Sequence, residues 1–161
     1  MIVISDTSCI GYLIIIDKLF LLKDNFSEII IPQKVHNEVL QLSAKYNLHK
    51  YLSSDWININ TIVNNKLYNE LLNQVDEGEA EAIVLSHEMS ADLLLIDERK
   101  GALLARSLGI KTVGLLGVLL LSKEKKIIPL VKPFLDELIS NTTFRINNIL
   151  YQNVLKQANE L

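Results

Sequence analysis

The chain has 161 residues, a hydrophobic fraction of 49% and a formal net charge of −3. This length fits one domain, and the apolar content is sufficient for a buried core, which excludes a chain that is disordered throughout. The slight acidic excess argues against the broad basic surface of a protein that binds nucleic acid through phosphates alone. A single cysteine excludes an internal disulfide and a zinc cluster and favours a reducing compartment, so we expect a cytoplasmic protein.

No segment predicts export or membrane insertion. The N-terminal sequence MIVISDTS lacks a positively charged lead and reaches Asp6 before any apolar run is long enough for a signal peptide. The apolar stretch 112–121 has only ten residues, whereas a membrane span needs about 20. We therefore expect no membrane partner.

Short apolar segments alternate with longer helical patterns along the chain. Residues 1–5 have the pattern of a central parallel strand covered on both faces, and residues 9–23 predict a helix or a broken pair of helices. Residues 28–31 predict a second strand. The helix expected over 32–46 starts with a proline, which is well placed in a first helical turn.

The polar section that follows allows one short strand at 56–63. Beyond it, further strands are predicted at 92–96 and 110–113, and helices at 66–75, 78–90, 99–108, 115–126, 129–139 and 146–159. Strands separated by helices imply parallel pairing in one covered sheet. We expect an α/β protein with three layers, α/β/α, around a mostly parallel sheet. Residues 1–161 form one domain in this prediction, with the helices from about 129 onward as a C-terminal extension.

Two acidic residues follow strongly apolar strands. Asp6 comes directly after the strand 1–5, and Asp97 after the strand 92–96. Ligands of open α/β sheets bind outside the carboxyl ends of the strands, so both carboxylates are candidates for one site. The alternative is that each aspartate only caps the helix that follows it.

Glu38 is a third candidate because of its position on the predicted helix 32–46. It lies three residues after Val35 and four before Leu42, on or beside the apolar stripe. A carboxylate facing apolar surroundings has a raised pKa unless a cation or hydrogen bonds compensate it. The alternative is an edge glutamate whose carboxylate reaches water.

Glu79 and Glu81 lie in the first turns of the helix predicted at 78–90. Side chains two residues apart on a helix diverge, so at most one of them is expected to face Asp6 and Asp97. An acidic first turn also complements the helix dipole, which explains both residues without any further role.

Four ordered segments of the chain resemble the PIN-domain nucleases, and more narrowly the toxin-like, VapC-type subgroup of bacterial and archaeal toxin–antitoxin systems. The resemblance covers nearly the whole chain. The segments are VISDTSCIGYL (3–13), IIIPQKVHNEVL (29–40), DEGEAEAIVLSHEMSADLLLIDERKGALLARSLGIKTVGLLGVLLLSKEKKII (76–128) and PFLDELI (133–139).

The resemblance implies a metal-dependent endoribonuclease that hydrolyses RNA phosphodiester bonds and is held inactive by a cognate antitoxin. Its acidic quartet, which holds Mg²⁺ or Mn²⁺, falls on Asp6, Glu38, Glu79 and Asp97, with Glu81 as the alternative to Glu79. The hydroxyl that follows its first acid falls on Thr7 or Ser8.

The residue types suit this chemistry. Mg²⁺ and Mn²⁺ prefer carboxylate and water oxygens. A bound ion lowers the pKa of water and offsets charge on the phosphate, so no histidine or cysteine ligand is required. Arg99 and Lys100 follow Asp97 closely and are candidates for substrate contact. They are equally explained as solvent-exposed residues in the first turn of a helix.

Three further expectations concern rival functions and assembly. A non-catalytic binding module with the same fold is one alternative, and a receiver-like phosphoacceptor domain is another, although the first strand is not followed by an adjacent acidic pair. The leucines of 115–121 exceed a single helical stripe, which favours a homodimer, although burial in the core explains most of them.

Overall fold

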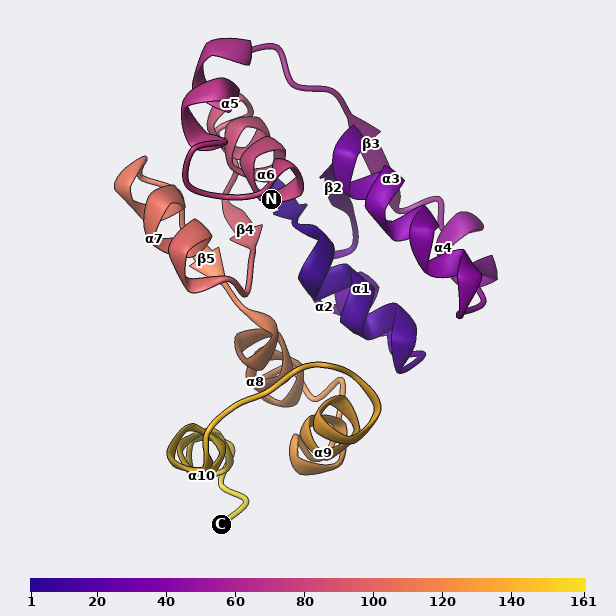
Figure 1. Ribbon diagram of the computed structural model, residues 1–161. Helices are drawn as coiled ribbons and strands as arrows, with labels where there is room; N and C mark the ends of the chain where they lie inside the picture. Colours follow the sequence, from indigo (N-terminus) through magenta and orange to yellow (C-terminus); the bar gives the residue numbers. More distant parts are fainter.

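The computed structural model describes all 161 residues. A five-stranded sheet with the order β3-β2-β1-β4-β5 lies at the centre, and every neighbouring pair of strands is parallel (Figure 1). The strands are β1 (Val3–Ser5), β2 (Ile29–Pro32), β3 (Ile57–Asn60), β4 (Leu93–Leu95) and β5 (Thr112–Val113). The predicted α/β class with a mostly parallel sheet is confirmed.

Helices connect the strands and continue beyond the last one. They are α1 (Thr7–Ile15), α2 (Phe20–Phe26), α3 (Gln33–Leu40), α4 (His49–Leu52), α5 (Asn65–Leu71), α6 (Glu77–Glu88), α7 (Arg99–Ser107), α8 (Leu115–Glu124), α9 (Lys132–Asn141) and α10 (Asn148–Gln157), with a 3-10 helix η1 (Gln41–Ala44) after α3. Figure 1 shows α8, α9 and α10 grouped at the opposite end of the molecule from α5 and α6.

Two apolar clusters cover the two faces of the sheet. Successive strand side chains point to opposite faces, so Val3 joins one cluster and Ile4 the other. The cluster that includes Val3 also contains buried residues of α1, α2, α3, α8, α9 and α10, and the second contains those of α5, α6 and α7. The three layers expected from the alternating pattern therefore form around a sheet buried on both sides.

Two of the predicted helical segments are divided or shortened in the structure. The segment 9–23 is the second of the two expected alternatives, a broken pair, α1 and α2, and the chain turns between them at Asp17, whose φ of 57° lies in the left-handed region. The helix predicted over 32–46 ends at Leu40 and continues only as η1. Pro32 belongs to β2 and is the N-cap of α3. The short helix α4 was not predicted, because the polar section carries no clear helical period.

The helices after β5 are tied together by one carboxylate. Glu160 accepts hydrogen bonds from the backbone N–H groups of Val131 (2.7 Å) and Lys132 (3.0 Å) at the start of α9, and from Nζ of Lys123 on α8 (2.9 Å). Its side chain is 5% exposed. The C-terminal end of the chain, after α10, is thereby anchored to α8 and to the start of α9.

The apolar residues of α8 divide between core and surface. Leu115, Val118 and Leu119 are buried, while Leu116, Leu120 and Leu121 are half-buried against the core, so packing within the chain accounts for most of them. None of the helices combines the length and the hydropathy that crossing a bilayer requires.

Candidate active site

Asp6 and Asp97 lie at the carboxyl ends of the adjacent strands β1 and β4. The register pairs Ser5 with Leu95, and the backbone N–H of Asp6 donates to the carbonyl of Leu95 at 2.9 Å. The two aspartates therefore leave the same edge of the sheet in neighbouring positions, as the pattern of apolar strands followed by acids indicates.

Cys9 contacts both aspartates. Its backbone N–H donates to Oδ1 of Asp6 (3.2 Å) and its thiol donates to Oδ2 of Asp97 (3.6 Å). Oδ1 of Asp97 accepts a second bond from the backbone N–H of Leu115, in the first turn of α8 (2.7 Å). Asp97 is thereby oriented from two sides, and the positive end of the α8 dipole faces its carboxylate.

The second oxygen of Asp6 has no partner. Asp6 is 1% exposed, and its Oδ2 is buried without a hydrogen bond. Leaving a buried charged oxygen unsatisfied is costly, and in native proteins such an atom calls for an explanation such as catalysis or a bound ion. The capping role of Asp6 on α1 accounts only for Oδ1.

Glu38 approaches the same edge from α3, which follows β2, the neighbour of β1 on its other side. Its Oε1 accepts a hydrogen bond from the hydroxyl of Thr7 (3.1 Å). The side chain is half-buried. Thr7 thus links the third candidate to the segment that carries Asp6, and its hydroxyl is used to orient Glu38.

Glu79 and Glu81 diverge, as their spacing predicts. Oε2 of Glu81 accepts the backbone N–H of Lys34 (3.2 Å), in the first turn of α3. The carboxylate of Glu79 lies instead beside Gly101 in the first turn of α7, and its charge raises the pKa of Asp6. Of the two glutamates, Glu79 faces the group that contains Asp6.

The carboxylates of this group have raised pKa values. Burial raises the pKa of Asp6 well above its ordinary range, and the negative charges of Asp97 and Glu79 raise it further. Burial likewise raises the pKa values of Glu38 and Asp97. Burial, followed by the charges of Asp76 and Glu98, raises the pKa of Glu79 to about 7. No basic side chain forms an ion pair with any of the four acids, although the hydrogen bond from Thr7 and the charge of Lys34 lower the pKa of Glu38 in part.

Asp76 is a neighbour of the site that sequence reasoning did not single out. It caps α6 by accepting the backbone N–H of Glu79 (2.9 Å), and its charge raises the pKa values of Asp6, Glu38 and Glu79. The acidic run at 76–79 was visible in the sequence, but compensation of the helix dipole explained it equally well.

Two glycines make room for the acids. A Cβ atom on Gly114 would lie 2.8 Å from Oδ1 of Asp97, and one on Gly78 would overlap Oε1 of Glu38. These two glycines were therefore a second sequence signal for this site, since each stands where a carboxylate passes close to the backbone.

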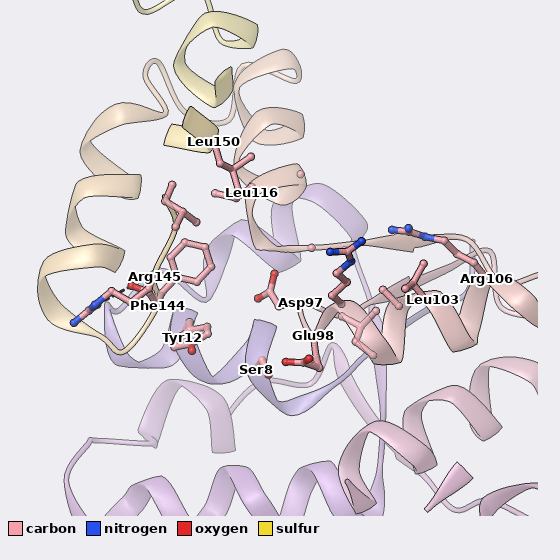
Figure 2. Close-up of a pocket in the computed structure, with 16 residues that line it drawn as sticks. Ser8, Tyr12, Asp97, Glu98, Leu103, Arg106, Leu116, Phe144, Arg145 and Leu150 are labelled. Atoms are coloured by element: carbon pink, nitrogen blue, oxygen red, sulfur yellow. Dashed lines mark hydrogen bonds between the residues drawn. The ribbon is translucent and has the colours of Figure 1, made fainter. Parts of the chain in front are cut away.

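Two hollows flank the acids. A hollow of about 470 Å³ is lined by Asp76, Glu79, Glu98 and Lys100, among other residues. A cavity of about 650 Å³, shown in Figure 2, is lined among others by Ser8, Asp97, Glu98 and Arg99. The predicted substrate-contacting residues thus fall on different surfaces: Ser8 and Arg99 face the cavity, Lys100 the hollow, and Thr7 contacts Glu38.

The four acids do not form a closed cage of metal ligands. No three side chains of histidine, cysteine, aspartate or glutamate are positioned together as direct metal ligands. Mg²⁺ commonly keeps several waters and takes only one or two protein carboxylates, so a looser group of oxygens is adequate for it. The unpartnered buried oxygen of Asp6 is the feature that fits such an ion.

Comparison with known proteins places the whole chain in one family. The model of the DUF3368 family, described as a PIN domain, matches residues 2–160. The chain is a PIN domain. The resemblance of the four sequence segments to PIN domains is therefore confirmed for the family as a whole.

The fold of a solved structure agrees. A PilT N-terminus domain protein from the hyperthermophilic archaeon Sulfolobus solfataricus P2 is similar to this PIN domain with a TM-score of 0.51 and 14% sequence identity, over 91% of this chain and 100% of that chain. At this identity the likeness concerns the fold alone. The comparison with curated proteins gives no match.

Proposed function

We propose that this PIN domain is a Mg²⁺- or Mn²⁺-dependent endoribonuclease. The observation that carries the proposal is the buried oxygen of Asp6 without a partner, beside Asp97 at the carboxyl edge of the sheet, with Glu38 and Glu79 approaching from helices α3 and α6. PIN domains are generally nucleases, and an all-oxygen donor set suits hard divalent ions.

Asp6, Glu38, Glu79 and Asp97 are the residues that would hold the ion. A bound divalent cation supplies an activated water and charge neutralisation at the phosphate. The chain's own contribution is to position the acids: Cys9 and the α8 N-terminus orient Asp97, and Thr7 orients Glu38. Protons compete with the metal for this group because the carboxylate pKa values are raised.

The positive charge needed by an anionic substrate comes from the neighbouring helix. Arg99 and Lys100 begin α7 and are exposed on either side of the acidic group. Arg99 makes no ion pair or hydrogen bond within the chain, which leaves its guanidinium available for a phosphate. Ser8 contributes a hydroxyl to the same cavity.

The test is cleavage of a single-stranded RNA with Mg²⁺ or Mn²⁺, with and without chelator. We expect cleavage that disappears with chelator and in Asp97→Asn, and that is retained in the matched control Asp24→Asn, an exposed aspartate on α2. Mn²⁺ binding measured by calorimetry should weaken in Asp97→Asn and stay unchanged in Asp24→Asn. RNA cleavage that is indifferent to chelator and to Asp97→Asn would rule out the proposal.

The non-catalytic binding module is separated from the nuclease by the same measurements. A module that has lost activity would bind RNA without cutting it at any metal concentration. The receiver alternative would require a phosphate analogue such as beryllofluoride to be retained on one aspartate, and membership of the PIN family favours the nuclease.

The proposal extends to a toxin role with a cognate antitoxin as partner. Its support is the toxin-like sequence segments, including VISDTSCIGYL (3–13). Expression of the chain alone should arrest growth, and Asp97→Asn should relieve the arrest. Growth arrest that persists in the Asp97→Asn variant would separate toxicity from the acidic group.

A homodimer is also part of the proposal. Its support is the apolar surface that Leu116, Leu120 and Leu121 leave half-exposed on α8. Light scattering at micromolar concentration should give twice the chain mass of 18.2 kDa. A mass equal to one chain would contradict the dimer without affecting the nuclease.

A further inference from the structure

The cavity beside Asp97 extends away from the acidic group toward the C-terminal helices. Its volume of about 650 Å³ lies within the range of roughly 300–1,000 Å³ for pockets that hold small organic ligands. The carboxylate of Asp97 faces it from one side, while the segment between α9 and α10 closes the other (Figure 2). Whatever occupies this cavity would therefore lie next to the site of the proposed reaction.

The walls of the cavity combine apolar and cationic groups, and the acids Asp97 and Glu98 line it as well. Leu116 of α8 and Leu150 of α10 lie on one side, and the ring of Phe144 lies beside them (Figure 2). Phe144 packs edge to face against Tyr12, with ring centroids 5.6 Å apart and an interplanar angle of 79°. Arg99 lines the same cavity. An apolar wall beside a guanidinium that has no partner in the chain matches an unpaired nucleotide, whose base packs on apolar groups and whose phosphate accepts charged hydrogen bonds.

The aromatic wall is held in place by the segment between α9 and α10. The guanidinium of Arg145 points away from the cavity and donates to the carbonyls of Ile139 (3.0 Å), Thr142 (2.9 Å) and Phe144 (2.7 Å) (Figure 2). The backbone N–H of Phe144 donates to the hydroxyl of Thr142 (3.0 Å). A wall fixed before binding reduces the entropy lost when a ligand is bound.

We infer that this cavity binds the unpaired base of the nucleotide next to the cleaved phosphodiester. The base packs against Leu116, Leu150 and the Phe144 ring, and Arg99 binds the adjoining phosphate. This inference rests on the proposed nuclease function and adds to it a subsite for one base, which must be unpaired because a base held in a duplex cannot enter a cavity. Leu150 is then a specificity-determining residue outside the acidic group.

The first experiment uses RNA oligonucleotides in which one nucleotide beside the cleavage site is abasic. Base stacking is worth about 1–3 kcal/mol, so the abasic substrate should be cut with a kcat/KM lower by about 5- to 150-fold at one of the two flanking positions. Leu150→Trp, which narrows the cavity at its wall, should lower cleavage of the intact RNA toward the abasic rate and affect the abasic RNA much less. Ile149→Trp is the matched control, because Ile149 is 74% exposed on the same helix and does not line the cavity.

A general folding defect is distinguished by its effect on both substrates, since it slows the intact and the abasic RNA alike. If Leu150→Trp behaves in this way, Leu150→Ala provides the second measurement. It removes part of the stacking surface without adding volume, and it should reduce the intact-to-abasic ratio by several-fold. An unchanged ratio in Leu150→Ala and equal rates on both substrates in the wild type would each overturn the inference.

Photocrosslinking separates failure of the inference from failure of the nuclease proposal. An RNA that carries 4-thiouridine at the flanking position is crosslinked to the wild-type protein in chelator, and the attachment is mapped by mass spectrometry. Crosslinks to Phe144 or Tyr12 without any metal-dependent cleavage would reject the nuclease and retain the base site. Metal-dependent cleavage with crosslinks elsewhere would retain the nuclease and reject the base site.

A protein partner is the other class of occupant, and the same variants separate it from the base. If Leu150→Trp leaves the cleavage of both RNA substrates unchanged, the cavity does not hold the base, and that outcome overturns the inference. Loss of the base effect in Leu150→Trp but not in Ile149→Trp supports it.

Discussion

Asp6 and Glu160 are both enclosed carboxylates, but the chain treats them in opposite ways. Burial raises the pKa of Glu160, yet hydrogen bonds from the backbone of Lys132 and Val131 and from Lys123 bring that pKa below its ordinary value. Burial raises the pKa of Asp6 well above its ordinary value, and neighbouring acids raise it further. The first carboxylate joins helices, while the second keeps a free oxygen. Where a buried charge has only a structural role, this chain supplies it with donors.

Among the proposed variants, Asp6→Asn should have the largest effect on RNA cleavage. Asparagine still caps α1 through Oδ1, but it removes the charge, and a metal ion contributes several kcal/mol to such reactions, so RNA cleavage should fall about 10³-fold. The melting temperature of the metal-free protein should rise, because an unpartnered buried charge is removed. Activity assays and calorimetry check the two effects. A less stable, fully active variant would contradict the proposed role of Asp6.

Gly114→Ala should displace Asp97 without changing its charge. The new Cβ would lie 2.8 Å from Oδ1 of Asp97, so the carboxylate must move, and cleavage should fall about 10- to 100-fold, as for groups that orient metal ligands. Gly11→Ala is the control, because its Cβ would make an ordinary contact at 3.7 Å with Leu42. Steady-state kinetics measure both, and equal losses would show a general effect of adding a methyl group.

Glu160→Gln should have the opposite effects to Asp6→Asn, because it should lower stability and leave RNA cleavage almost unchanged. It weakens three hydrogen bonds that join α8, α9 and the C-terminal end, and should lower the free energy of unfolding by about 1–3 kcal/mol. RNA cleavage at a temperature where the variant is folded should change less than twofold. Urea denaturation measures the loss. A large loss of activity in the folded variant would mean that the two carboxylates are coupled.

The stability of the metal-free protein should depend on pH through the acidic group. The folded pKa of Glu79 is about 7, against 4.5 as its ordinary value, so the folded state retains a proton that the unfolded chain loses. Its contribution to stability is fully present below about pH 4.5 and is lost as the pH rises through about 7. Because Glu79 is half-exposed, we expect a change of about 1 kcal/mol.

Thermal unfolding in chelator at pH 5 and pH 8 measures this change, and Glu79→Gln should flatten it. Added Mg²⁺ should raise the melting temperature more at pH 8 than at pH 5, since protons no longer compete. A profile that stays as steep in Glu79→Gln would assign the pH dependence to another group.

The smallest effect is expected at Glu81. Its carboxylate accepts a backbone N–H of α3 rather than facing Asp6, so Glu81→Gln should change cleavage less than threefold and stability by about 0.5 kcal/mol. Glu79→Gln is the paired variant, for which Mn²⁺ affinity should fall at least tenfold. Calorimetric titration of Mn²⁺ decides between them. If Glu81→Gln is the variant that loses affinity, the third acid was assigned wrongly.

The parts of the site that were predictable are those fixed by strand order. An apolar run followed by an acid places Asp6 and Asp97 at one edge whenever the two strands are parallel neighbours, and the structure has this pairing. The helical period placed Glu38 beside a buried stripe, and the structure leaves it half-buried. The divergence of Glu79 and Glu81 follows from helix geometry alone.

Other parts depend on contacts that no local pattern encodes. Thr7 was a candidate for substrate contact, but its bond to Glu38 joins residues 31 positions apart. The cavity wall needs Tyr12 of α1 to pack against Phe144, which follows α9, and neither residue stands out in the sequence. The break between α1 and α2 was one of two alternatives for residues 9–23, and apolar periodicity could not choose between them because the break occurs at one left-handed residue, Asp17.

The burial of Cys9 has a practical consequence for labelling. It is the only cysteine, it is 0% exposed, and burial raises the pKa of its thiol well above the ordinary value. Reagents such as maleimides attack the thiolate, so the folded chain should behave toward them as if it had no cysteine. A cysteine introduced at the exposed position of Ile149 would therefore carry a single fluorophore beside the cavity, without any need to alter the native thiol.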